Sequence, residues 1–141
     1  MIIDAIREYI LTCPYLNEFA KGINVDYLGA EVDSYSIEET PCNPIIKKYI
    51  DGSSVKQFEF IFASRESYGP EVLQNIENCG FYEHFANWIE EQNRDMNYPK
   101  LKDGIRVQKI ECTSTGYAYQ TGVDCARYQI QLRLIYYKNL N

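Results

Sequence analysis

The run from Ala126 to Tyr137 constrains the fold most, because every second side chain from Tyr128 to Tyr136 is apolar or aromatic while the other face is mixed. Alternation with a period of two predicts a strand that buries one face and leaves the other free. An earlier run, 54–63, has the same pattern, with Phe58, Phe60 and Phe62 on one side. Two long half-buried strands favour an antiparallel sheet over a parallel sheet wound alternately with helices.

Helical periodicity occurs in three places. Ile2–Leu11 carries its apolar residues on one stripe and ends before Pro14. Gly69-Pro70 predicts the start of a second helix, which Gly80 is expected to end as a C-terminal cap. A third helix is expected to follow. Its stripe consists of Phe81, Phe85, Trp88 and Ile89.

Shorter β-type segments complete the pattern. They are Ile23–Leu28, the weaker Val32–Ile37, Ile45–Ile50 and Ile105–Cys112. Asp51-Gly52 is a strong turn signal, so Ile45–Ile50 is expected to form a hairpin with the following strand. The sequence therefore predicts one α+β domain over residues 1–141. Its antiparallel or mixed sheet should be packed on one face by two to three helices.

The segment Thr113–Asp124, between the last two strands, is polar and contains Gly116, Tyr117, Tyr119 and Gly122. It is longer than a tight hairpin connection requires. We therefore expect a mobile loop that becomes ordered against a partner.

Composition excludes several classes of protein. The net charge is −6 and the pI is near 4.8, which argues against a compact basic footprint for specific nucleic-acid binding. No apolar run is long enough to span a membrane, and the charged N-terminus is unlike a signal peptide, so we expect synthesis in the cytoplasm. The five cysteines lack ligand spacing. We therefore expect no metal and no cofactor, and reduced cysteines that pack as small apolar residues.

No constellation of residues points to catalysis. The single histidine, His84, has no nucleophile beside it in the sequence, and the acidic pairs Glu38-Glu39 and Glu90-Glu91 are adjacent residues that point apart on a regular element. Phosphate-binding glycine loops are absent from the sequence. We therefore expect no catalytic residues and a protein that is not an enzyme.

Two stretches resemble a known family. They are SRESYGPEVLQNIENCGFYEHFANWIEEQNR and QKIECTSTGYAYQTGVDCARYQIQLRLIYY, within residues 58–138. The SRESYG turn, the QNIEN-G-F segment, the GY of the loop and the ARYQI–RLIYY strand are similar to the tail terminator or minor capsid proteins of long-tailed phages and prophages of Gram-positive bacteria. The family also occurs in phage-tail-like particles. Some relatives carry a chloramphenicol-resistance label, but the HHxxxDG motif of the acetyltransferase is missing here.

The resemblance implies an α+β subunit of a six-membered ring at the head-proximal end of the tail tube. Such a ring stops tube polymerisation and offers a surface for head joining. The implied partners are further copies of the chain, the tail tube protein, and a head-completion or connector protein. In a headless particle a collar replaces the connector, and in a contractile tail the sheath protein is a further partner. The resemblance also implies a ring open to the passage of DNA, with no specific nucleic-acid binding and no membrane partner.

The family supplies no catalytic residues, so the site residues we expect are surface residues. Tyr117, Tyr119, Arg127 and Arg133 are candidates for the contact with a neighbouring subunit or the tube. Glu38, Glu39, Glu90 and Glu91 are candidates for an acidic bore that keeps DNA from adhering. Two alternatives stay open. One is that all these residues are ordinary solvent-facing side chains, and the other is a small cytoplasmic binding or regulatory module of a mobile element without enzymatic activity.

Overall fold

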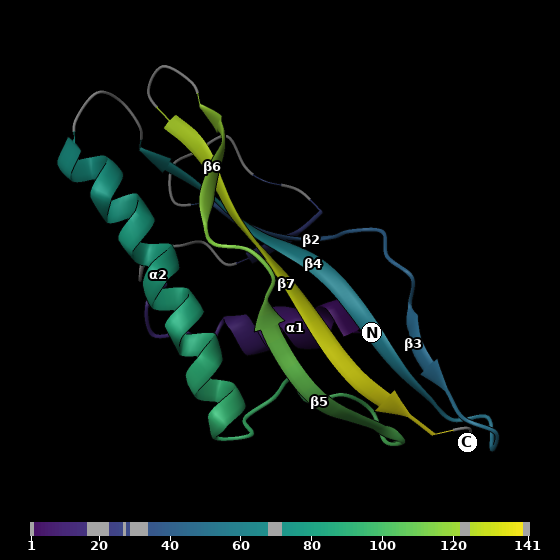
Figure 1. Cartoon of the computed structure of the whole chain (residues 1–141). Coiled ribbons are helices and arrows are strands. Elements are labelled where there is room, and N and C mark those ends of the chain that lie inside the picture. The colour runs from purple at the N-terminus through teal and green to yellow at the C-terminus, as the bar shows by residue number, and fades with distance from the viewer. Residues whose placement is uncertain are drawn as a thin grey trace.

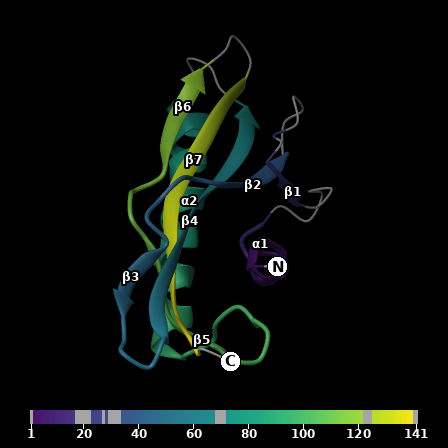
Figure 2. The same ribbon diagram turned by 90° about the vertical axis from the view of Figure 1, so that its right-hand side faces the viewer.

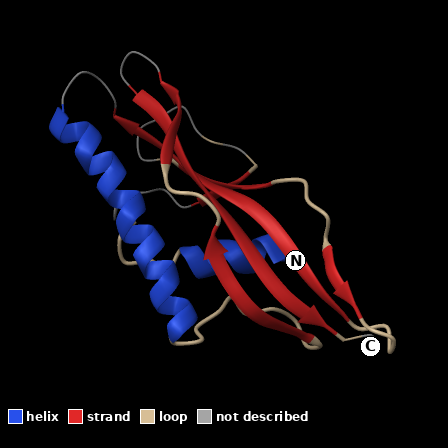
Figure 3. Cartoon of the chain, in the orientation of Figure 1, coloured by secondary structure: helices blue, strands red, loops and turns tan. Residues whose placement is uncertain are grey.

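The computed structural model describes residues 2–16, 23–26, 28, 34–67, 72–121 and 125–139, and of these the side chains of 72–79 and 120 are not described. Two helices and a seven-stranded sheet lie in this part of the chain (Figure 1, Figure 3). In chain order the elements are α1 (Ile2–Ile10), β1 (Ile23–Val25), β2 (Tyr35–Glu39), β3 (Ile45–Lys48), β4 (Ser54–Ser67), α2 (Val72–Arg94), β5 (Ile105–Cys112), β6 (Tyr117–Thr121) and β7 (Cys125–Lys138).

The two long strands predicted from alternation, β4 and β7, form the centre of the sheet. They pair antiparallel over their full length, from Ser54 opposite Lys138 to Ser67 opposite Cys125. The free side of β4 is shared by β2 and β3, and the free side of β7 by β5 and β6. Strand β1 pairs parallel with β2, so the sheet is mixed. The predicted α+β class and sheet are confirmed.

Both helices pack on one face of this sheet and leave the other without a helix. The alternate residues Phe60, Phe62, Ile130, Leu132 and Leu134 are buried. They join one cluster with α1 and α2 side chains, listed here by element: Ile3, Ile6 and Ile10 from α1, and Tyr82, Phe85, Trp88 and Ile89 from α2. Figure 2 shows α1 on one side of β4 and β7 and β3 on the other.

The expectation of two helices on either side of Gly80 is wrong. Helix α2 runs unbroken from Val72 to Arg94 with Gly80 inside it. The Phe81–Ile89 stripe packs on the sheet, and this packing holds the helix through a residue whose own propensity would favour an end. The predicted start at Gly69-Pro70 lies outside the described residues.

The expected loop Thr113–Asp124 contains a strand of five residues. Residues Tyr117–Thr121 form β6, which pairs with the first part of β7, and residues 122–124 lie outside the described part. Gly116 is needed for space, because a Cβ placed on it would overlap the Cβ and Cγ of Tyr82. The glycine therefore lets the chain that enters β6 pass close to α2.

Candidate interaction surfaces

The four contact candidates from the sequence all lie on the face of the sheet that carries no helix. Arg127 and Arg133 are on the side of β7 opposite to its buried residues, and Tyr117 and Tyr119 come from the neighbouring β6. Gln129 and Gln131 fill the positions between the two arginines. We call this surface, from Glu38 on β2 to Tyr117 on β6, the outer sheet face.

Side chains of the outer sheet face hold one another in place. The Nη2 of Arg127 donates to Glu38 Oε1 at 2.7 Å, and its Nε donates to Gln129 Oε1 at 3.0 Å. The Nε2 of Gln129 in turn donates to the Tyr117 hydroxyl at 2.7 Å. The guanidinium carbon of Arg127 also lies 5.6 Å from the ring centroid of Tyr119. One connected polar path therefore runs from β2 over β4 and β7 to β6.

A second charged group continues the outer sheet face toward β5. Arg133 donates to Glu111 Oε1 through both Nε and Nη2, and the other oxygen of Glu111 lies 2.7 Å from Lys109 Nζ. Hydrogen bonds from Lys109, and then from Arg133, lower the pKa of the Glu111 carboxyl below its usual range. Glu111 is thus a charged side chain fixed between two cations.

The acidic bore candidates are not brought together. Glu38 is half-buried in its ion pair with Arg127, and Glu39 is exposed beyond it on β2. Glu90 and Glu91 are exposed on α2, which packs against the opposite face of the sheet. These two acidic pairs therefore belong to separate surfaces of one subunit.

The β3–β4 hairpin presents an exposed apolar surface that the sequence did not reveal. Nine large apolar side chains are exposed in the described part of the chain, and four of them are in residues 45–50: Ile45, Ile46, Tyr49 and Ile50. Ile50 is fully exposed at the turn. The sequence IIKKYI could have indicated this surface, because it does not alternate and places an isoleucine next to the Asp51-Gly52 turn. We call residues 45–52 the hairpin tip.

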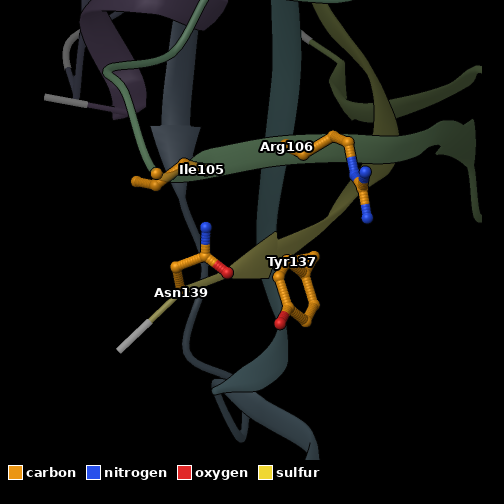
Figure 4. A pocket seen from close by; sticks show the side chains of 5 residues that line it. Ile105, Arg106, Tyr137 and Asn139 are labelled. Atoms are coloured by element: carbon orange, nitrogen blue, oxygen red, sulfur yellow. The ribbon is translucent and has the colours of Figure 1, made fainter. Parts of the chain in front are cut away.

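Basic residues gather at the end of the sheet that bears the hairpin tip. Strand pairing brings the ranges 45–57, 105–109 and 135–139 together there, and they contain six of the fourteen Lys and Arg residues but only one of the twenty acids. The guanidinium of Arg106 lies 5.5 Å from the ring centroid of Tyr137. Both line a hollow of about 380 Å³ with Gly104, Ile105 and Asn139 (Figure 4). This hollow offers a cation and a phenol, with no carboxylate, thiol or imidazole among its described lining residues.

The groups most often used in catalysis have structural surroundings. His84 is exposed and stacks on Tyr15, with ring centroids 5.0 Å apart. Burial raises the pKa of the Cys13 thiol to about 11 and that of Cys112 to about 12, so both are protonated and unreactive at neutral pH.

The described residues contain no cluster of metal ligands and no helix that could span a membrane. Within that part of the chain no three His, Cys, Asp or Glu side chains are grouped as metal ligands would be, and all four cysteines whose side chains are described are free thiols. Neither described helix combines the length and hydropathy needed to cross a lipid bilayer.

Comparison with known proteins gives no relative from which a role could be transferred. A scan against protein-family models found no match to the chain, and a search of curated proteins also found none.

Proposed function

We propose that this chain is a structural subunit of a phage tail or phage-tail-like particle, forming a six-membered ring that caps the head-proximal end of the tail tube. The observation that carries the proposal is the outer sheet face. There Tyr119 is exposed and Tyr117 and Arg133 are partly exposed, while Arg127 and Gln129 beneath them are largely buried in a hydrogen-bonded network that positions these side chains. The resemblance in the α2 and β5–β7 segments supports the same role.

The fixed side chains make this face suited to binding a protein. A long side chain loses conformational freedom when it enters an interface, and that loss weakens binding. Arg127, Gln129 and Tyr117 have lost much of it in the free subunit, because each is held by a neighbour. Tyr and Arg are also the residue types that contribute most at protein interfaces.

The role assigns a partner to each side of the ring. One side faces the tail tube protein, and the other faces a head connector or, in a headless particle, a collar. A contractile tail would add its sheath protein. The remaining contacts are between copies of the chain, and in a ring they join two different surfaces of the subunit.

The test is to delete the gene from the particle that encodes it and to measure tail length by electron microscopy. We expect tubes of uncontrolled length that join no heads, and normal tails when the wild-type gene is restored. A cryo-electron microscopy reconstruction of the restored tail should place six copies at the tube end next to the head. Normal tails without the gene would reject the proposal.

The competing role is a small cytoplasmic binding or regulatory module of a mobile element. It would show as a chain absent from purified particles and recovered with a soluble partner. The same deletion strain distinguishes the two roles, because a regulator would change expression and leave tail length unaltered.

A further inference from the structure

We infer that the hairpin tip of one copy docks in a groove on the next copy, between α1 and residues 97–100. This rests on the proposed ring and deepens it, because it names the contact between neighbouring subunits. The groove is lined by Asp4, Ala5, Glu8, Tyr9, Thr12, Asn97, Tyr98, Pro99 and Lys100, and we call it the α1 groove.

The hairpin tip has the composition of a buried contact. Ile50 is fully exposed at a turn, where free chains usually carry polar residues, and Ile45, Ile46 and Tyr49 extend the apolar surface along β3. The turn itself is rigid. Asp51 accepts hydrogen bonds from the Ser53 backbone nitrogen at 2.9 Å and from its hydroxyl at 2.5 Å, and Tyr49 accepts one from Gly52. These bonds fix the backbone of the turn on either side of Ile50.

The α1 groove is a formed hollow of about 700 Å³ with apolar walls. Tyr9, Tyr98, Pro99 and Ala5 supply those walls. The Tyr9 hydroxyl donates to the Asn97 carbonyl at 2.9 Å, which ties α1 to the segment after α2. A groove that exists before binding can accept an apolar side chain without rearrangement.

Charge on the two surfaces is complementary. Lys47 and Lys48 lie between the apolar residues of the hairpin tip, and Asp51 is the one acid of the tip. Asp4 and Glu8 stand one turn apart on the exposed side of α1, at the rim of the groove. Glu8 also lies 3.4 Å from Arg7, and Lys100 is the one cation among the described lining residues. With Asp51 counted on the tip and Lys100 in the groove, the hairpin tip still carries net positive charge and the groove lining net negative charge.

The positions of the two surfaces fit a contact between copies. Strand β3 and helix α1 lie on opposite sides of β4 and β7 (Figure 2), so one subunit presents these two elements to different sides. Each copy therefore offers one tip and one groove to different neighbours. A contact between two different surfaces can be repeated around a closed ring.

The experiment is sedimentation equilibrium of the full chain up to about 1 mM, which detects contacts as weak as roughly 4 kcal/mol. We expect the wild-type chain to self-associate and Ile50→Asp to raise the dissociation constant at least about tenfold, as for a central interface residue. Ile50 contacts solvent only, so circular dichroism and the urea midpoint should stay unchanged. A chain that is monomeric throughout, or an Ile50→Asp variant that associates like the wild type, overturns the inference.

Charge reversal identifies the occupant of the groove. Lys47→Glu with Lys48→Glu should weaken association, and adding Asp4→Lys with Glu8→Lys should restore it to within a few-fold. The matched control adds Glu90→Lys with Glu91→Lys, an equal change of charge on α2, and should restore nothing. Rescue by the control, or no rescue by the groove pair, overturns the docking site.

Tail capping is scored separately on the same variants. A chain that associates through these residues but leaves tail length uncontrolled keeps the contact and rejects the tail terminator role. Capping that survives Ile50→Asp keeps the role and rejects the contact.

Discussion

Asn93 binds both backbone polar groups of Ile110 with its side-chain amide. The Ile110 nitrogen donates to Asn93 Oδ1 at 2.9 Å, and Asn93 Nδ2 donates to the Ile110 carbonyl. On its other side β5 pairs with β7, where Ile110 lies opposite Leu134. The amide at the end of α2 thus takes the place of a further strand. It satisfies one residue of an edge that would otherwise be open there to another chain.

Asn93→Ala should therefore lower the free energy of unfolding by about 1–3 kcal/mol, because it leaves a donor and an acceptor of β5 without their partner. Urea denaturation followed by circular dichroism measures the change. Asn87→Ala is the matched control: it makes the same substitution on the exposed side of the same helix. That variant should be neutral or slightly more stable, and equal effects of the two would contradict the role of Asn93.

Gly80→Ala should stabilise the protein by about 0.5–1 kcal/mol. Gly80 is inside α2, and nothing lies within 4 Å of the position that a Cβ would take. Alanine loses less backbone freedom on folding and fits a helix without strain. Thermal and urea unfolding should both shift upward, and a destabilised variant would mean that the helix is interrupted at this residue.

Gly116→Ala should have the opposite effect, a loss of about 2–3 kcal/mol, because the added Cβ overlaps the side chain of Tyr82. The Tyr82 hydroxyl hydrogen-bonds Ser64 Oγ at 2.6 Å and donates to the Tyr128 carbonyl at 3.0 Å, so moving the ring disturbs a buried group. The urea midpoint measures the loss. Stability equal to wild type would show that Tyr82 can move aside without cost.

Alternation predicted the fold because it reports burial directly. Strand β5 has the expected bounds, and β7 extends the expected range by one residue at each end. The predicted helix end at Gly80 is wrong because the low helix propensity of glycine costs only about 1 kcal/mol. The packing of Phe85 and Ile89 on the sheet outweighs that cost. The sequence predicts a mobile loop around Gly116, whereas this position requires a glycine because of the ring of Tyr82, which lies far away in the sequence.

The surfaces were only partly predictable for a related reason. Arg127 and Arg133 lie six residues apart on a strand, so the sequence alone puts them on one face. Their partners Glu38 and Glu111 belong to other strands, and only the register joins them. The exposure of Ile50 depends on how far the hairpin extends past its neighbours, which no local pattern contains.

Glu111 should make stability depend on pH in the acid range. Its folded pKa is below the ordinary value of 4.5, because Lys109 and Arg133 favour the charged form. A lowered folded pKa gives stability that is present above the unfolded value and lost as pH falls through the folded one. Glu111→Gln should therefore cost less than about 1 kcal/mol at pH 7. That cost should shrink as the pH is lowered past 4.5.

Urea midpoints of the wild type and of Glu111→Gln between neutral and acid pH test this. Glu83→Gln, an exposed acid on α2, serves as the control and should show no such convergence. A difference between wild type and Glu111→Gln that stays constant with pH would mean that the carboxylate charge contributes nothing.

A substitution at Tyr119 can affect assembly without affecting folding, because this side chain is 57% exposed and lies beside the guanidinium of Arg127 on the outer sheet face. Tyr119→Ala should change the free energy of unfolding by no more than about 0.5 kcal/mol. The variant should still lose tail-length control under the proposed role, since it removes a large aromatic contact from the interface. Tyr15→Ala is the matched control: Tyr15 is 46% exposed and stacks on His84, away from that face, so tails of normal length are expected. Normal capping by both variants would show that the outer sheet face meets no partner at Tyr119.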